Sequence, residues 1–199
     1  TEPPEELIPQ FSIIRDATDA LQIPRVEIEG YEADDIIATY TKRAEKKGIS
    51  VTIVSSDKDF MQLINDKTFL YAPQARKRAK EVFNKKKVLE KWGVGPEHII
   101  DLLGLMGDSS DNVPGVQGVG PKTAMKLIQD FGSIENIYEE IDNISNEKMR
   151  EKLLNSKENA LLSKQLVTIL TDVNIEATIN DFEKKEMDSV KLEDIFKEL

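Results

Sequence analysis

The sequence predicts an α/β core followed by a helical part, within a chain of 199 residues. Strand-like and helix-like segments alternate up to about residue 80, which is typical of a parallel sheet flanked by helices. Beyond that point the strand signal largely disappears and helical periodicity dominates. Hydrophobic residues make up 39% of the chain and charged residues 32%, as in ordinary folded proteins. We therefore expect two closely joined parts, residues 1–80 and residues 81–199.

In the first part, apolar spacing and end signals define the helices, and β-branched runs define the strands. The expected helices are one that follows Pro3 and Pro4 and carries Leu7, Phe11, Ile14 and Leu21 at helical spacing, then Glu32–Lys47 and a short one at Phe60–Ile64. The expected strands are Arg25–Glu29, Ile49–Ser55 and Thr68–Tyr71. Because Ile49–Ser55 is almost continuously apolar, we expect it to be buried on both faces.

The second part is predicted to be helical nearly throughout. The expected helices are Lys86–Trp92, Glu97–Met106, Lys122–Phe131, Ile134–Glu140, Glu147–Asn155, Glu158–Lys164 and Leu192–Leu199. Residues 166–169 could form a short strand or an extended segment. Residues 97–131 contain two helices joined by a glycine-rich turn, which predicts a helix–hairpin–helix motif.

The composition excludes several kinds of chemistry. The chain has no cysteine, so disulfides, thiolate zinc sites and thiol nucleophiles are excluded, and its one histidine, His98, makes a Ser-His-Asp triad improbable. No apolar run approaches the roughly 20 residues that span a bilayer, and no secretion signal opens the chain. Any catalysis must therefore depend on carboxylates.

The charge is unevenly distributed. The formal net charge is −10, yet residues 76–91 hold eight basic and two acidic residues. This segment is either a solvated surface stretch or a strip that contacts phosphates on an otherwise acidic protein.

Three groups of acids lie where an α/β sheet usually places its active site. One group follows the buried strand, the second opens the helix after the preceding strand, and the third lies in a loop after residue 106. Taken singly, each group could be a helix-terminal or turn acid. Together, seven carboxylates at one rim would repel one another unless cations held them, and hard oxygen ligands favour Mg²⁺ or Mn²⁺. Two such ions would serve displacement at phosphorus, one activating a water and both stabilising charge. The candidate metal ligands, and hence catalytic residues, are Glu32, Asp34, Asp35, Asp57, Asp59, Asp108 and Asp111.

Residues 113–123 (VPGVQGVGPKT), here called the hairpin, form the second candidate site. A phosphate-binding P-loop is excluded because Pro121 separates Gly120 from Lys122. What remains is either an ordinary Gly-Pro turn or a turn whose backbone N–H groups and following helix grip a DNA backbone without reading its sequence. The candidate DNA-binding residues are Gly118, Gly120, Lys122, Thr123 and Lys126.

The segments YEADDIIATY, VSSDKDF and LLGLMGDSSDNVPGVQGVGPKTA resemble the 5′-nuclease (flap endonuclease-like, 5′–3′ exonuclease) domains of bacterial DNA polymerase I, and the resemblance extends to QLVTILTDV. It implies a PIN-like metal-binding core, metal-ligand roles for the seven acids, and cleavage of flaps and 5′ ends in branched or nicked duplex DNA. It further implies that carbonyls matching Gly115, Val116 and Val119 hold a K⁺ ion that bridges to a duplex phosphate. Polymerase domains of the same parent chain and a cytoplasmic, nucleoid-associated location in a bacterium are also implied.

The resemblance begins after the family's first strand and helical arch, which carry further metal and phosphate ligands and which residues 1–199 do not include. We therefore expect these residues alone to bind branched DNA weakly and to cleave poorly. The alternative function is a non-catalytic, structure-specific DNA-binding module in which the acids only stabilise the fold.

Overall fold

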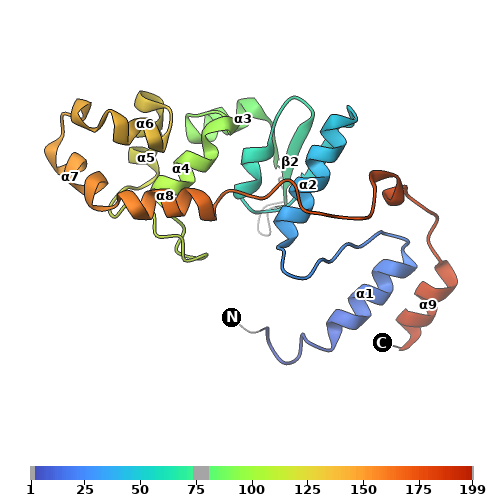
Figure 1. The fold of residues 1–199 in the computed structure, drawn as a ribbon. Helices are drawn as coiled ribbons and strands as arrows, with labels where there is room; N and C mark the ends of the chain where they lie inside the picture. Colours follow the sequence, from blue (N-terminus) through green and yellow to red (C-terminus); the bar gives the residue numbers. More distant parts are fainter. Residues whose placement is uncertain (1–2, 74–80, 199) are drawn as a thin grey trace.

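The computed structural model describes residues 3–73 and 81–198 and shows a small sheet, a larger group of helices and a separate pair of terminal helices (Figure 1). Residues 76–80 of the basic segment lie outside the described residues. In chain order the elements are α1 (Gln10–Ala20), α2 (Ala33–Lys46), β1 (Val51–Val54), η1 (Asp59–Leu63), β2 (Thr68–Ala72), β3 (Glu81–Phe83), α3 (Lys85–Trp92), η2 (Pro96–His98), α4 (Ile99–Met106), α5 (Pro121–Phe131), α6 (Ile134–Glu139), η3 (Ile141–Asn143), α7 (Glu147–Asn155), α8 (Lys157–Leu166), η4 (Ile179–Phe182) and α9 (Ser189–Glu198), where η denotes a 3₁₀ helix.

The sheet has the order β1-β2-β3 and is mixed. Strands β1 and β2 are parallel, with Ile53 opposite Leu70, which confirms the predicted parallel pair. Strand β3 runs antiparallel to β2 and places Phe83 opposite Leu70 on its other side. The sequence analysis did not predict β3, because it is only three residues long and lies within the basic segment.

The prediction that β1 is buried on both faces is wrong. Only Ile53 of this strand is buried, and the side chain of Val54 is 66% exposed. The predicted strand Arg25–Glu29 is also absent, so within the described residues β1 pairs with β2 alone. Residues 25–29 have the alternation of a strand, but alternation requires a neighbouring strand to become a ladder. The Arg25 guanidinium instead makes two hydrogen bonds to the Asp19 carboxylate.

The helices of the second part agree with the prediction except in detail. The segment expected as one helix over Glu97–Met106 divides into η2 and α4, and residues 166–169 form no strand. Helix α7 has the predicted bounds, and Asn146 caps it by accepting a hydrogen bond from the Met149 backbone N–H (3.1 Å).

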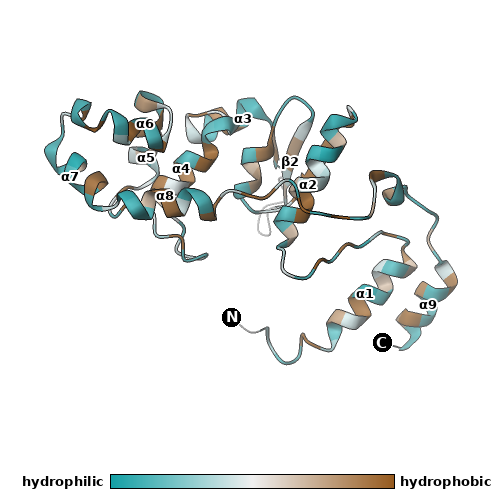
Figure 2. Ribbon diagram, in the orientation of Figure 1, coloured by the Kyte–Doolittle hydropathy of each residue, from teal (hydrophilic) through white to brown (hydrophobic). Residues whose placement is uncertain are grey.

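Helix α4 is the centre of the core. Its residues Leu102, Leu103 and Leu105 are at most 2% exposed, and Figure 2 shows the apolar run of α4 enclosed by its neighbours. Gly104 allows the backbone of α8 to approach, because a Cβ at this position would lie 3.1 Å from the Lys164 backbone. One apolar cluster extends from Ile53 in the sheet to the helical part, so the loops carried by both parts rest on one packed core.

The first and last helices, α1 and α9, lie side by side, and the Asp188 backbone N–H donates to the Ala20 carbonyl (2.8 Å). The apolar residues that predicted α1 are largely solvent-exposed, since Phe11 is 41% and Ile14 54% accessible. Among the described residues, no helix combines the length and apolar character needed to cross a membrane.

Candidate metal centre and nucleic-acid-binding hairpin

The first two acids stand directly after β1, at its carboxyl end, as predicted. Asp57 forms a turn in which its Oδ1 accepts a hydrogen bond from the Asp59 backbone N–H (2.8 Å), and Asp59 then opens η1. Asp57 is exposed, whereas Asp59 is partly buried. The two side chains therefore differ in solvation although only one residue separates them.

The second group of acids opens α2. Glu32 is the N-cap residue, and Asp34 and Asp35 lie in the first turn, where the helix dipole favours negative charge. Asp35 also has a structural contact, because its Oδ1 accepts a hydrogen bond from the Leu170 backbone N–H (2.8 Å). The side chain of Asp34 makes no such hydrogen bond among the described residues.

The third group lies in the loop between α4 and the hairpin. The backbones of Asp108 and Val113 exchange two hydrogen bonds (2.9 and 2.8 Å), which close the loop. Asp108 Oδ1 accepts from the Ser110 backbone N–H (2.8 Å) and from the Ser110 hydroxyl, while Asp111 is exposed. The acid-bearing loop and the hairpin thus form one continuous, hydrogen-bonded unit.

The seven acids, called the acid cluster below, influence one another electrostatically. Burial, followed by the charge of Asp57 and weaker contributions from Glu32, Asp35 and Asp111, raises the pKa of Asp34 to about 6. Burial and the charge of Asp57 likewise raise the pKa of Asp59 to about 6, with further contributions from Asp108 and Asp111. Each of the seven acids either has one of these two raised pKa values or contributes its charge to raising one. The three chain segments therefore converge on one region.

Lys58, which the sequence analysis did not single out, places a positive charge among these acids. Its ammonium forms an ion pair with Asp108 and lies 3.7 Å from Asp59 Oδ1. The hydrogen bond from Lys58 holds the pKa of Asp108 well below its usual range. Burial favours the neutral amine of Lys58, but the Asp108 hydrogen bond and the charges of Asp59, Asp108 and Asp57 together outweigh it and raise the pKa of the lysine. The sequence feature that could have identified Lys58 is its position between two acids in the segment DKD.

The acid cluster fits a divalent cation chemically. Its members offer only hard carboxylate oxygens, and Asp59 Oδ1 is a buried oxygen with no hydrogen-bond partner. Over residues 3–73 and 81–198, however, no three Asp, Glu or His side chains are already arranged to hold one ion. The structure therefore brings the predicted acids into one electrostatic cluster without a completed ligand shell, and binding an ion would require side chains to reorient.

One side of the hairpin packs against the core, and its other side is exposed to solvent. Its valines, Val113, Val116 and Val119, are buried, whereas Gln117, Gly118 and Gly120 are exposed. The Val116 backbone N–H donates to the Leu105 carbonyl (2.9 Å), and the Gly115 N–H donates to the buried Ser163 hydroxyl (2.8 Å). The hairpin is thereby fixed to α4 and α8.

The exposed side of the hairpin presents hydrogen-bond donors. Within the described part of the chain, the backbone N–H groups of Gln117, Gly118, Gly120 and Lys122 donate no hydrogen bond. Pro121 begins α5, and the exposed Lys122 and Lys126 follow in its first turns, with the half-buried Thr123 between them. The structure thus places the five predicted DNA-binding residues around one turn with unpaired donors, an arrangement suited to an anion.

Comparison with known proteins agrees with this geometry. The chain is 48% identical over 196 residues to DNA polymerase I of Bacillus subtilis, covering 98% of this chain and 22% of that protein. It is 48% identical over 178 residues to DNA polymerase I of Rhizobium leguminosarum, covering 89% of this chain and 17% of that protein. The chain therefore spans about a fifth of the length of these relatives.

Solved structures show the same fold. A bacteriophage T5 D15 flap endonuclease variant in complex with DNA and metal ions aligns with a TM-score of 0.69 and 29% identity, over 84% of this chain and 61% of that one. T5 5′-exonuclease with bound zinc aligns with a TM-score of 0.68 and 25% identity, over 100% of this chain and 71% of that one. The catalytic core of Rad2 shares the fold at 19% identity, with a TM-score of 0.68, over 99% of this chain and 65% of that one.

Two family models match consecutive parts of the chain. The N-terminal resolvase-like domain of 5′–3′ exonucleases matches residues 1–93, and their C-terminal SAM fold matches residues 94–190. This succession confirms the predicted fold class, an α/β core followed by a helical part. The chain belongs to the 5′–3′ exonuclease family.

Proposed function

We propose that this chain is the nuclease part of a DNA polymerase I and acts on flapped, nicked or otherwise branched duplex DNA as a 5′–3′ exonuclease and flap endonuclease. One observation carries the proposal. The loop bearing Asp108 and Asp111 continues directly into the hairpin and is closed by the Asp108–Val113 backbone pair, so candidate metal ligands and a phosphate-binding turn belong to one rigid unit.

The acid cluster would hold Mg²⁺ or Mn²⁺, and two or more ions are consistent with seven carboxylates drawn from three chain segments. Divalent ions supply a nucleophile at neutral pH and stabilise the charge that develops on a reacting phosphate. Asp34 and Asp59 would contribute ionised oxygens above about pH 6. Asp35 would be held in place by its hydrogen bond to the backbone at Leu170. Lys58 would orient Asp108 through their ion pair.

The hairpin would bind the duplex backbone away from the reacting phosphate. The free N–H groups of Gly118 and Gly120, with Lys122, Thr123 and Lys126, would contact phosphate oxygens without reading bases. The carbonyls of Gly115, Val116 and Val119 are the candidate K⁺ ligands. Val116 already accepts a hydrogen bond from the Val119 N–H (3.0 Å), which leaves its carbonyl oxygen a second lone pair.

The polymerase relatives also suggest partner domains and a location for this chain. We infer that polymerase domains of a parent chain hand branched DNA to the hairpin, and that the protein acts on the bacterial chromosome in the cytoplasm. The T5 flap endonuclease that aligns with this chain was crystallised with DNA and metal ions, which supports both ligand classes.

Calorimetric titration with Mg²⁺ and Mn²⁺, with flap-DNA binding and cleavage followed in parallel, tests the proposal. The double variant Asp57→Asn, Asp59→Asn should lose saturable metal binding and any cleavage while keeping DNA affinity. A matched double variant of exposed acids, Asp142→Asn, Asp172→Asn, should behave as the unmodified chain.

The outcomes separate the proposal from its alternative. Metal binding without cleavage supports the site together with the expectation that residues 1–199 alone cleave poorly. DNA binding by an unmodified chain that takes up neither Mg²⁺ nor Mn²⁺ saturably and cleaves no DNA would instead favour a non-catalytic, structure-specific DNA-binding module.

A further inference from the structure

Lys152, on α7, reaches across to the hairpin. A Cβ placed on Gly118 would lie 2.9 Å from Lys152 Nζ and 3.6 Å from its Cε. Gly118 also has φ of +76°, a backbone conformation that favours glycine. The ammonium of Lys152 therefore lies against the exposed turn of the hairpin, although the two residues are separated by most of α5, α6 and α7 in the chain.

The position of Lys152 is set by packing. Its neighbour Leu153 is completely buried, and the Tyr138 hydroxyl donates to the Leu153 carbonyl (3.0 Å). These contacts fix α7 against the same core that anchors the hairpin. Lys152 itself is exposed, so surrounding side chains do not confine it. The position of α7 places its side chain near the turn.

This lysine is not paired with an acid in the part of the chain that the structure describes. Within the described residues its ammonium forms no ion pair and no hydrogen bond, although the chain carries a net charge of −10. By contrast, Lys164 on the neighbouring helix α8 is paired with both Asp101 and Glu135. An unpaired cation beside the unpaired N–H groups of Gln117 and Gly118 concentrates positive potential on one turn. Such a combination attracts an anion.

We propose that Lys152 binds the DNA phosphate that the hairpin holds, and that it extends the contact surface from α5 to α7. This inference rests on the proposed function and adds a residue to it. The ligand is a phosphodiester of the duplex backbone, contacted through charge and without base specificity. Gly118 then has a second role, because its missing side chain leaves room for the lysine.

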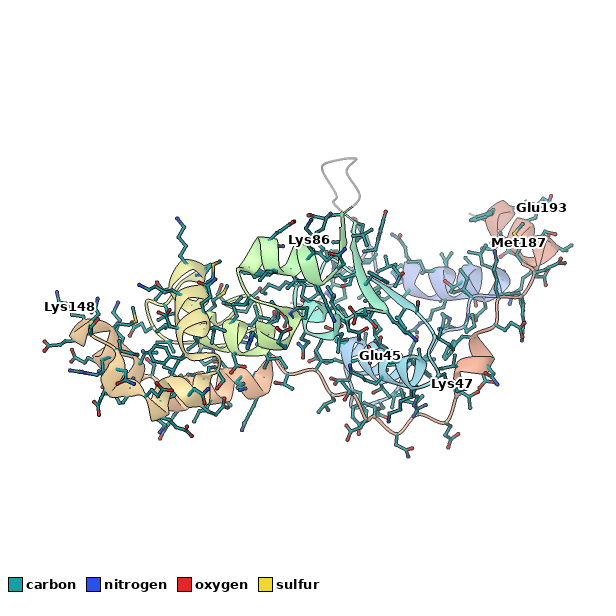
Figure 3. All side chains as sticks on the ribbon, turned by 90° about the horizontal axis from the view of Figure 1, so that it is seen from above. Glu45, Lys47, Lys86, Lys148, Met187 and Glu193 are labelled. Atoms are coloured by element: carbon teal, nitrogen blue, oxygen red, sulfur yellow. The ribbon has the colours of Figure 1, made fainter. Side chains whose placement is uncertain are left out.

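Lys148 provides a matched control. It lies one helical turn before Lys152, is exposed, forms no ion pair among the described residues, and stands at the outer end of α7 (Figure 3). Lys148 is not among the atoms within 4 Å of the Gly118 position. Substituting either lysine removes one positive charge from the same helix, so only the contact with the hairpin distinguishes the two variants.

The test is the affinity of the 199-residue chain for a fluorescently labelled 5′-flap duplex, measured by anisotropy in EDTA over a range of salt concentrations. Lys152→Ala should weaken binding by about 5- to 10-fold at 100 mM salt and lower the slope of log affinity against log salt by about 1. Lys148→Ala should change affinity by less than about twofold, and Lys152→Arg should retain most of it. Thermal unfolding of each variant reports whether the fold is intact.

Equal losses in Lys152→Ala and Lys148→Ala would overturn the proposal, because the effect would then be one of overall charge. Unchanged binding in Lys152→Ala would overturn it while leaving the hairpin as a DNA-binding element. If the unmodified chain bound no duplex DNA, the proposal and the DNA-binding part of the proposed function would both fail. Loss of metal binding alone would affect only the proposed function.

Discussion

Replacing Asp59 by Asn should make the chain more stable in the absence of divalent ions. The charge of Asp59 is disfavoured in the folded chain by burial and by the neighbouring carboxylate of Asp57. Asn has nearly the same shape and carries no charge, so the substitution removes the repulsion without leaving a cavity. Stability gained by replacing a candidate metal ligand would indicate that repulsion between carboxylates destabilises the folded chain when no cation is bound.

The magnitude follows from the pKa. A rise in the pKa of Asp59 from the ordinary value of 3.8 to about 6 corresponds to at most ~3 kcal/mol of destabilisation at neutral pH. The side chain of Asp59 remains 21% exposed and lies near Lys58, so water and this cation screen part of the repulsion. We therefore expect Asp59→Asn to raise the free energy of unfolding by about 1–2 kcal/mol at pH 7.5.

The pH dependence has a definite sign. Because the folded chain binds the Asp59 proton more tightly than the unfolded chain does, this group destabilises the fold increasingly as pH rises from about 4 to about 6. Asp34 acts in the same direction. The advantage of Asp59→Asn should accordingly fall to about half its value at pH 5. Asp108, whose pKa is lowered, loses its stabilising charge only at more acidic pH.

Urea unfolding in EDTA, followed by circular dichroism and by the fluorescence of the single tryptophan, Trp92, measures these differences. Asp172→Asn, at an exposed position, is the control and should change stability by less than about 0.5 kcal/mol. Addition of Mn²⁺ should reverse the order, since the unmodified chain would bind the ion more tightly and gain more stability. An Asp59→Asn chain that is less stable than the unmodified chain in EDTA at pH 7.5 would refute the reasoning.

Further substitutions in the hairpin and the helical part test the contacts that hold them in place. Gly115→Ala should lower Tm strongly, because its Cβ would lie 2.5 Å from backbone at a φ of +61°, whereas Gly120→Ala, with no atom within 4 Å, should leave Tm within about 2 °C in a thermal melt. Ser163→Ala should cost about 1–3 kcal/mol in urea unfolding by leaving the buried Gly115 N–H unpaired, and a cost near zero would show that the hairpin is anchored otherwise. Asp101→Ala should cost about 1–3 kcal/mol, since it leaves the buried Ile134 N–H at the start of α6 unpaired and removes one of the two carboxylates that pair with Lys164, and Asp101→Asn should recover part of this loss.

Local patterns were sufficient to predict the helices but not the sheet. The bounds of α7 and the acidic first turn of α2 follow from neighbours within one or two turns, which the sequence displays directly. The exposure of β1 does not follow in this way. A run of β-branched apolar residues indicates a strand, yet which edges and faces are covered depends on chain segments far away in sequence. The same reason accounts for residues 25–29, whose alternation finds no partner strand.

The sequence predicted the part of the candidate site that lies at the carboxyl end of a strand. Asp57 and Asp59 follow β1 at its carboxyl end, so the rule for parallel sheets located them. Asp34 reaches the same region for another reason, since the strand that was expected to place it is absent and the packing of α2 against β1 brings it there. Such rules could not predict which groups two of the lysines contact. Lys58 pairs with Asp108, fifty positions away, and Lys152 approaches Gly118 from a different helix. In both cases the sequence shows a charged residue, and only the packed core determines which group it meets.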